Sequence, residues 1–115
     1  MQQITIVAVL AHARGKVYKV MADGKTVLIL LTFHVLERTV KWQLTVQAVL
    51  QALLFPEEVL RGHRGRFIAH RRRQRHLVRA VYEYEGSMPV VVTVYSPAAK
   101  RYFQGGGIYE DHILS

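Results

Sequence analysis

The sequence predicts an α+β domain in which N-terminal strands and two short helices precede an antiparallel meander sheet of about four strands. Three observations lead to this prediction. Apolar residues alternate along both ends of the chain, as they do in strands. The spacing changes to that of a helix only between residues 34 and 55. Short turn sequences separate the later strands, as in a meander, and we expect the helices to cover one face of their sheet.

The first part of the chain predicts three strands joined by tight turns. Their expected ranges are residues 4–10, 16–21 and 26–32. Asp23-Gly24 lies between the last two and is a strong hairpin signal, because a tight primed turn requires a positive φ that glycine adopts without strain. The third strand is apolar on both sides, so we expect both of its faces to be covered.

Two helices are expected next. Residues 34–41 suit a short helix, in which Leu36 and Val40 lie one turn apart. Thr45 is a typical N-cap for a second helix, whose apolar residues recur at i, i+3, i+4 and i+7 and which ends near Phe55-Pro56. This spacing predicts an amphipathic helix with one face toward the core.

The second half of the chain predicts four strands and gathers polar groups on one sheet face. The expected ranges are residues 57–61, 66–72, 76–85 and 88–96. Alternation in the last two strands places Arg79, Thr93 and Tyr95 on the face opposite the second helix. The alternation is ambiguous in the strand 66–72, so either His70 or Arg71 joins them. A polar, glycine-rich tail follows.

Length and composition suit a single domain over residues 1–115. Half of the residues are apolar or Tyr and 21% are charged, which argues against disorder. The absence of cysteine excludes disulfides, thiolate metal sites and cysteine nucleophiles. No apolar run approaches the roughly 18 residues that a membrane span needs, and the N-terminus lacks a secretory leader. We therefore expect a cytoplasmic protein with no membrane partner.

Positive charge is concentrated in one stretch. The net charge is +8, and eight arginines lie in residues 61–79, which contain no acidic residue. Guanidinium groups bind phosphate in a bidentate manner, so the stretch predicts contact with a polyanion, with RNA first. The candidate RNA- or phosphate-binding residues are Arg66, Arg71, Arg72, Arg73, Arg75 and Thr93. The alternative is a solvated edge hairpin whose charges prevent aggregation.

A few side chains have the chemistry for cleaving RNA without a metal. That reaction needs a base, an acid and a cation for the phosphorane. His34 and His70 are candidates for base or acid, Arg79 for the cation and Tyr95 for an orienting group. The alternative is that His34 only caps its helix or bonds to the sheet. No histidine pair has a clear third ligand, so we expect no metal site and no cofactor.

Five short segments form a pattern that extends over most of the chain. They are Phe33-His34-Val35-Leu36-Glu37-Arg38, Phe55-Pro56-Glu57-Glu58-Val59, Ile68-Ala69-His70-Arg71, Leu77-Val78-Arg79-Ala80-Val81-Tyr82-Glu83 and Val91-Val92-Thr93-Val94-Tyr95. Together they resemble a prokaryotic domain family of unknown function that is grouped with the RelE-like toxins, in the barnase, EndoU, colicin and RelE nuclease fold. The resemblance covers about residues 26–103, as a RelE-like core. Residues 1–25 are then an N-terminal hairpin extension and residues 104–115 a C-terminal tail.

The resemblance implies helices followed by a four-stranded antiparallel sheet, with His34 facing the sheet near Arg79. It also implies a metal-independent endoribonuclease that acts on RNA as the toxin of a toxin–antitoxin pair, with an acidic antitoxin as partner. The alternative is a non-catalytic basic module that binds RNA or another protein. The N-terminal hairpin could continue the sheet or mediate a homodimer.

Overall fold

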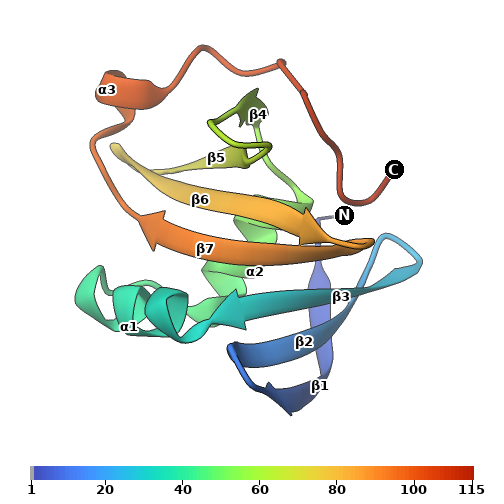
Figure 1. Cartoon of the computed structure of the whole chain (residues 1–115). Coiled ribbons are helices and arrows are strands. Elements are labelled where there is room, and N and C mark those ends of the chain that lie inside the picture. Colours follow the sequence, from blue (N-terminus) through green and yellow to red (C-terminus); the bar gives the residue numbers. More distant parts are fainter. Residues whose placement is uncertain (1) are drawn as a thin grey trace.

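The computed structural model describes residues 2–115 and forms one seven-stranded mixed sheet with three helices (Figure 1). The elements are β1 (Ile4–His12), β2 (Gly15–Ala22), β3 (Lys25–Thr32), α1 (Phe33–Lys41), α2 (Val46–Leu54), β4 (Glu58–Arg61), β5 (Phe67–Arg73), β6 (His76–Glu85), β7 (Met88–Tyr95) and α3 (Ala99–Tyr102). The strand order is β1-β2-β3-β7-β6-β5-β4, and only β3 and β7 are parallel neighbours. The chain is therefore an α+β protein.

The predicted antiparallel meander of about four strands is wrong, whereas the N-terminal strands, for which continuing the sheet was one of two expected roles, do extend it. The expected strand segments exist, but β1, β2 and β3 belong to the same sheet as β4 to β7. The two halves join where Leu30 pairs with Val90 and Leu31 with Val91. A parallel contact between strands so distant in the chain requires no short turn, and therefore it leaves no local signal in the sequence.

The apolar character of β3 explains its place at this junction. Ile29 and Leu31 point into the main core, while Leu30 on the other face packs against Val17 and Val90. The side chains of Ile29, Leu30 and Leu31 are fully buried. The prediction that both faces of this strand are covered is thus confirmed for residues 29–31, whereas Leu28 is 45% exposed.

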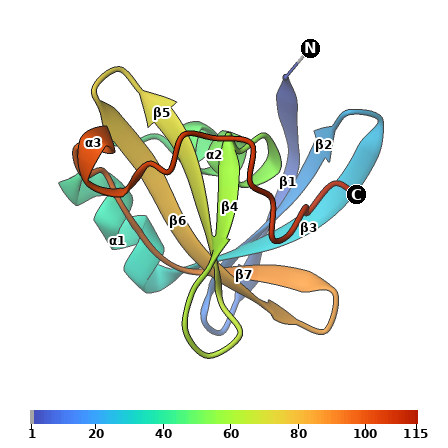
Figure 2. The ribbon, with the colours of Figure 1, turned by 90° about the horizontal axis from the view of Figure 1, so that it is seen from above.

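Threonine caps begin α1 and α2, and α2 forms one side of the main core. The hydroxyl oxygen of Thr32 accepts from Val35 N–H at 3.3 Å, and that of Thr45 accepts from Ala48 N–H at 3.0 Å. The sheet curls around α2, which contacts β5, β6 and the opposite edge strand β1 (Figure 2). Buried side chains of the sheet and of α2 fill the space between them.

The C-terminal arm, residues 99–115, lies on the sheet face that α2 does not cover. Its helix α3 contacts β6, and the arm then passes the outer edge of β4, where Val59 and Tyr109 form a parallel bridge (Figure 2). Beyond the edge, Leu114 enters the main core. Helices therefore lie on both faces, and the expectation of helices on one face is wrong because the glycine-rich tail folds back over the sheet.

Candidate functional site

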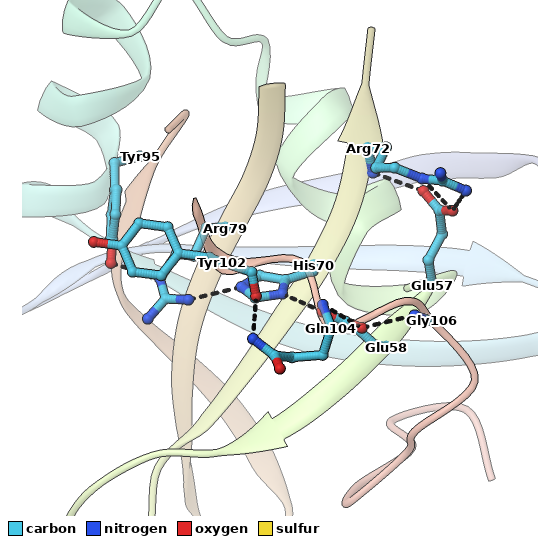
Figure 3. A network of polar contacts seen from close by, with 9 residues as sticks. All are labelled: Glu57, Glu58, His70, Arg72, Arg79, Tyr95, Tyr102, Gln104 and Gly106. Atoms are coloured by element: carbon cyan, nitrogen blue, oxygen red, sulfur yellow. Dashed lines mark hydrogen bonds and ion pairs between the residues drawn. The ribbon is translucent and has the colours of Figure 1, made fainter. Parts of the chain in front are cut away.

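Four side chains form a row across β4, β5, β6 and β7, which we call the Arg79 row: Glu58, His70, Arg79 and Tyr95. The strand register places Glu58 opposite His70, His70 opposite Arg79, and Arg79 opposite Tyr95. Directly opposed residues of antiparallel neighbours project from the same face of a sheet. Figure 3 shows the four groups side by side beneath the C-terminal arm.

Hydrogen bonds connect the row from a carboxylate to a phenol. The imidazole Nδ1–H of His70 donates to Glu58 Oε2 at 2.6 Å, and its Nε2 accepts from Arg79 Nη1 at 2.8 Å. Arg79 Nε donates to the hydroxyl of Tyr95 at 2.5 Å. Because a guanidinium group can only donate, Nε2 must carry a lone pair. The His70 imidazole is therefore neutral, with its proton on Nδ1.

The C-terminal arm completes the hydrogen bonding of Glu58. The backbone N–H groups of Gln104 and Gly106 each donate to this carboxylate at 2.9 Å (Figure 3). Gly106 has φ of +82°, a conformation that favours glycine. Glu58 and His70 have no solvent exposure, so a segment that follows the last strand seals a buried acid against the sheet.

Burial and hydrogen bonding set the charges of this pair. Burial lowers the pKa of His70, and the nearby Arg79 charge lowers it further, which outweighs the opposing effect of Glu58. Burial by itself raises the pKa of Glu58, but hydrogen bonds from His70 and the arm outweigh it, so the pKa lies below its ordinary value. The row thus holds an ionised carboxylate, a neutral imidazole and a guanidinium cation.

The lowered pKa of His70 predicts a loss of stability on mild acidification. In the unfolded chain, His70 takes up a proton near the ordinary histidine pKa of about 6.5. In the folded protein, its lowered pKa means that it is protonated only at a lower pH. This contribution to stability is complete above about pH 6.5 and is lost as the pH falls from there toward the folded pKa, with a slope of at most about 1.4 kcal/mol per pH unit. Thermal unfolding between about pH 7.5 and pH 5 measures it. His112→Gln, at an exposed histidine, should keep the wild-type slope, whereas His70→Gln should flatten it.

Two tyrosine rings flank the guanidinium of Arg79. Its Cζ atom lies 4.2 Å from the ring centroid of Tyr102 in α3 and 5.4 Å from that of Tyr95. The side chain is partly exposed, and within residues 2–115 its Nη2 group has no hydrogen-bond partner. The row therefore holds one cation in a fixed orientation with donors left for a ligand.

His34 lies beside the same sheet face. Its Nε2 is 3.4 Å from the hydroxyl of Thr93, which is two residues from Tyr95 and projects from the same side of β7. Arg38 Nε donates to this imidazole at 3.4 Å. The His34 side chain is exposed. Within residues 2–115, His34 and Arg79 share no hydrogen bond. His34 is next to Thr93 and Arg79 is next to Tyr95, and these two residues of β7 project from the same face of the sheet.

The structure resolves the choice left open for the strand 66–72. His70 joins Arg79, whereas Arg71 lies on the opposite face and donates to Phe55 O at 2.7 Å and to Gln2 Oε1 at 2.9 Å. Both of these acceptors belong to this chain, so Arg71 does not accompany the Arg79 row.

The remaining arginines of residues 61–79 are dispersed, and several have partners. Arg66 pairs with Glu83 at 2.8 Å, and Arg72 pairs with Glu57 at 2.7 Å. Arg73 donates only a long hydrogen bond to Gln43 O, and Arg75 is exposed at the β5–β6 turn. The stretch has no acid of its own, but neighbouring segments of the sheet supply carboxylates. The number of arginines free to bind an anion is therefore smaller than the sequence indicates.

An open groove of about 590 Å³ adjoins the Arg79 row. Its floor includes Ile68 and Val81, which directly oppose each other, two residues from His70 and Arg79 along their strands. The basic side chains of His63, Arg64 and Arg66 also line it. The groove thus combines an apolar floor with a basic rim.

The comparisons with known proteins assign no family to this arrangement. No protein-family model matches the chain, and no match was found among curated proteins or among solved structures. In residues 2–115 no helix is long and apolar enough to cross a membrane, and no group of three His, Asp or Glu side chains is placed to hold a metal ion. The function therefore has to be argued from the site alone.

Sequence reasoning missed Glu58, and it did not predict that Tyr102 contacts Arg79. One feature of the sequence could have indicated Glu58: it is an acidic residue in a short strand, next to Val59. An acid that is buried in a sheet needs hydrogen-bond partners that are buried with it. The contact of Tyr102 with Arg79 depends on how the C-terminal arm folds back, which local pattern does not reveal.

Proposed function

We propose that the protein is a metal-independent endoribonuclease whose site is the Arg79 row together with His34. The observation that supports this proposal most is the orientation of Arg79. A fully buried Glu58–His70 pair and the Tyr95 hydroxyl fix its guanidinium, while Nη2 stays free to meet a phosphate. Burying ionised groups is costly, so such an arrangement around a partly exposed cation favours a functional role.

The proposed reaction is attack of a 2′-hydroxyl on the adjacent phosphorus. His34 accepts the 2′-hydroxyl proton, the new P–O bond forms, and the P–O5′ bond breaks with water protonating the leaving oxygen. Arg79 stabilises the charge that develops on the phosphorane oxygens. His70 is buried with both ring nitrogens engaged, so we assign it to positioning Arg79 and no longer to the base or acid.

Cleavage of labelled single-stranded RNA in EDTA tests this proposal. We expect wild-type activity to persist without a divalent metal and His34→Ala to lower the rate by about 100-fold or more, because a general base contributes on that order. His112→Ala removes an exposed histidine of the C-terminal arm and should leave the rate unchanged. Equal rates for wild type and His34→Ala would remove His34 from the mechanism, and no cleavage by the pure protein would exclude the nuclease.

Binding without cleavage is the second candidate, because only one of the two predicted histidines, His34, is accessible. In that case RNA affinity should fall steeply with salt, since each neutralised phosphate releases counterions, and His34→Ala should have little effect. An acidic protein such as an antitoxin is the other polyanion that the basic surface could bind. A copurifying acidic chain that competes with RNA would identify it.

A further inference from the structure

The two edges of the sheet differ. At the β4 edge the C-terminal arm supplies backbone partners: Val59 N–H donates to Ile108 O at 2.7 Å, and Val59 O accepts from Glu110 N–H at 2.9 Å. At the other edge β1 pairs only with β2, and no segment within residues 2–115 pairs with its outer side. Near the start of β1, the side chains of Gln47 and Gln51 donate to Ile4 O and Gln2 O. The protein thus covers one edge with its own backbone and, in the part of the chain that the structure describes, leaves the other without a backbone partner.

The open edge is apolar and uncharged. β1 contains nine residues without a single Asp, Glu, Lys or Arg. The side chains of Val7, Val9 and Leu10 are each about half exposed, at 49%, 49% and 52%. Soluble proteins usually protect such edges with charges, proline or a covering segment. One register shift lies between Ile6 and Ala8, after which β1 pairs regularly with β2, so its outer backbone groups also form a regular row.

We propose that β1 pairs with β1 of a second copy of this chain, in antiparallel orientation about a two-fold axis near Val9. A strand that pairs antiparallel with its own copy needs no other partner, and the interface is the same on both subunits. The product is a homodimer with one continuous sheet. Val9 then lies opposite its copy and Leu10 opposite Ala8 of the partner, which covers the exposed apolar groups.

Charge favours a second copy as the occupant of this edge. The chain carries a net charge of +8, so most contacts between two copies would bring like charges together. β1 carries no charge, and the arginine-rich residues 61–79 lie on β4, β5 and β6 at the far end of the strand order. The sheet is curled, and Arg71 of β5 donates to Gln2 just before β1 at 2.9 Å, so the advantage of pairing through β1 is that the strand itself carries no charge.

The size of the contact sets the expected affinity. With the axis at Val9, residues 6–12 of β1 face residues 12–6 of the partner, so the paired stretch is about 24 Å long at roughly 3.4 Å per residue. A contact one strand wide buries less than the ~800 Å² per partner of a standard stable interface. Met21 and Leu28, on the next strands inward, are also about half exposed, and they enlarge the apolar region beside the edge. We therefore expect a dimer that dissociates on dilution.

Sedimentation velocity of the full chain over a range of concentrations tests this inference. We expect the wild-type mass to rise from monomer to dimer, and Val9→Lys to raise the dissociation constant at least about tenfold by placing two charges face to face. Val40→Lys is the matched control: Val40 is 80% exposed on α1, so this variant should dimerise like wild type. Leu10→Lys repeats the test at a second position, and circular dichroism checks that each variant is folded.

Three results would overturn the inference: a wild-type protein that stays monomeric at all concentrations, association that survives both Val9→Lys and Leu10→Lys, or assembly that stops only at larger oligomers. The experiment involves no RNA, so its outcome does not depend on the proposed nuclease. Conversely, Val9 and Leu10 belong neither to the Arg79 row nor to the groove beside it, so loss of the dimer should leave RNA cleavage unaltered.

Discussion

Glu58→Ala is expected to lower the free energy of unfolding by about 2–4 kcal/mol, because three hydrogen bonds to the carboxylate are lost and the buried N–H group of the neutral His70 is left without an acceptor. The substitution removes the acceptor for His70 Nδ1–H and for the N–H groups of Gln104 and Gly106. His70 has no solvent exposure, so its N–H group would lose its hydrogen bond without replacement, whereas the N–H groups of Gln104 and Gly106 lie in the partly exposed arm. The loss is a large fraction of the about 5–15 kcal/mol that stabilises a typical domain. Urea unfolding at neutral pH measures it.

The adjacent residue supplies a matched control. Glu57 pairs with Arg72 at 2.7 Å, but the two side chains are 30% and 54% exposed. An exposed pair contributes only about 0–1 kcal/mol, and Glu57 also accepts the backbone N–H of Arg72 at 2.7 Å, so Glu57→Ala should cost about 1 kcal/mol, less than Glu58→Ala. Glu58→Gln should fall between the two, because its amide keeps one acceptor oxygen but turns an NH₂ group toward donors. Similar losses for Glu57→Ala and Glu58→Ala would contradict the structural role of the buried pair.

Arg79→Lys is expected to reduce RNA cleavage by about 100-fold or more, although it conserves the net charge. Loss of one donor that stabilises a developing oxyanion commonly costs about 10²–10³ in rate. A lysine ammonium carries all three donors on one nitrogen, so it cannot occupy both the Nε position that donates to Tyr95 and the Nη1 position that donates to His70 and also present the separate Nη2 group to phosphate. Single-turnover cleavage of labelled RNA measures the effect, and unfolding experiments show whether the fold is retained.

Arg73→Lys is the control for this experiment, because Arg73 is exposed in the same basic stretch and makes only one long hydrogen bond. It should cleave RNA at nearly the wild-type rate. If Arg79→Lys also keeps the wild-type rate, the guanidinium geometry has no role in cleavage. If both variants lose activity equally, diffuse positive charge explains binding better than a defined site does.

The sequence by itself determined the local structure of the chain. The spacing of apolar residues predicted the strand and helix segments, Thr45 predicted a helix start, and alternation placed Arg79, Thr93 and Tyr95 on one face. These features could be predicted because they depend on φ, ψ and side-chain direction within a few residues. They do not depend on which strands become neighbours.

Only the tertiary structure decided how these segments combine. It joined β3 to β7 in parallel, enlarged the sheet to seven strands, and supplied carboxylates from other segments to the arginines of residues 61–79. It also placed His70 beside Glu58 and brought the N–H groups of Gln104 and Gly106 over that acid. The physical reason is that such contacts depend on the packing of segments distant in sequence, where burial and charge pairing act on the whole fold and leave no periodic signal in any one segment.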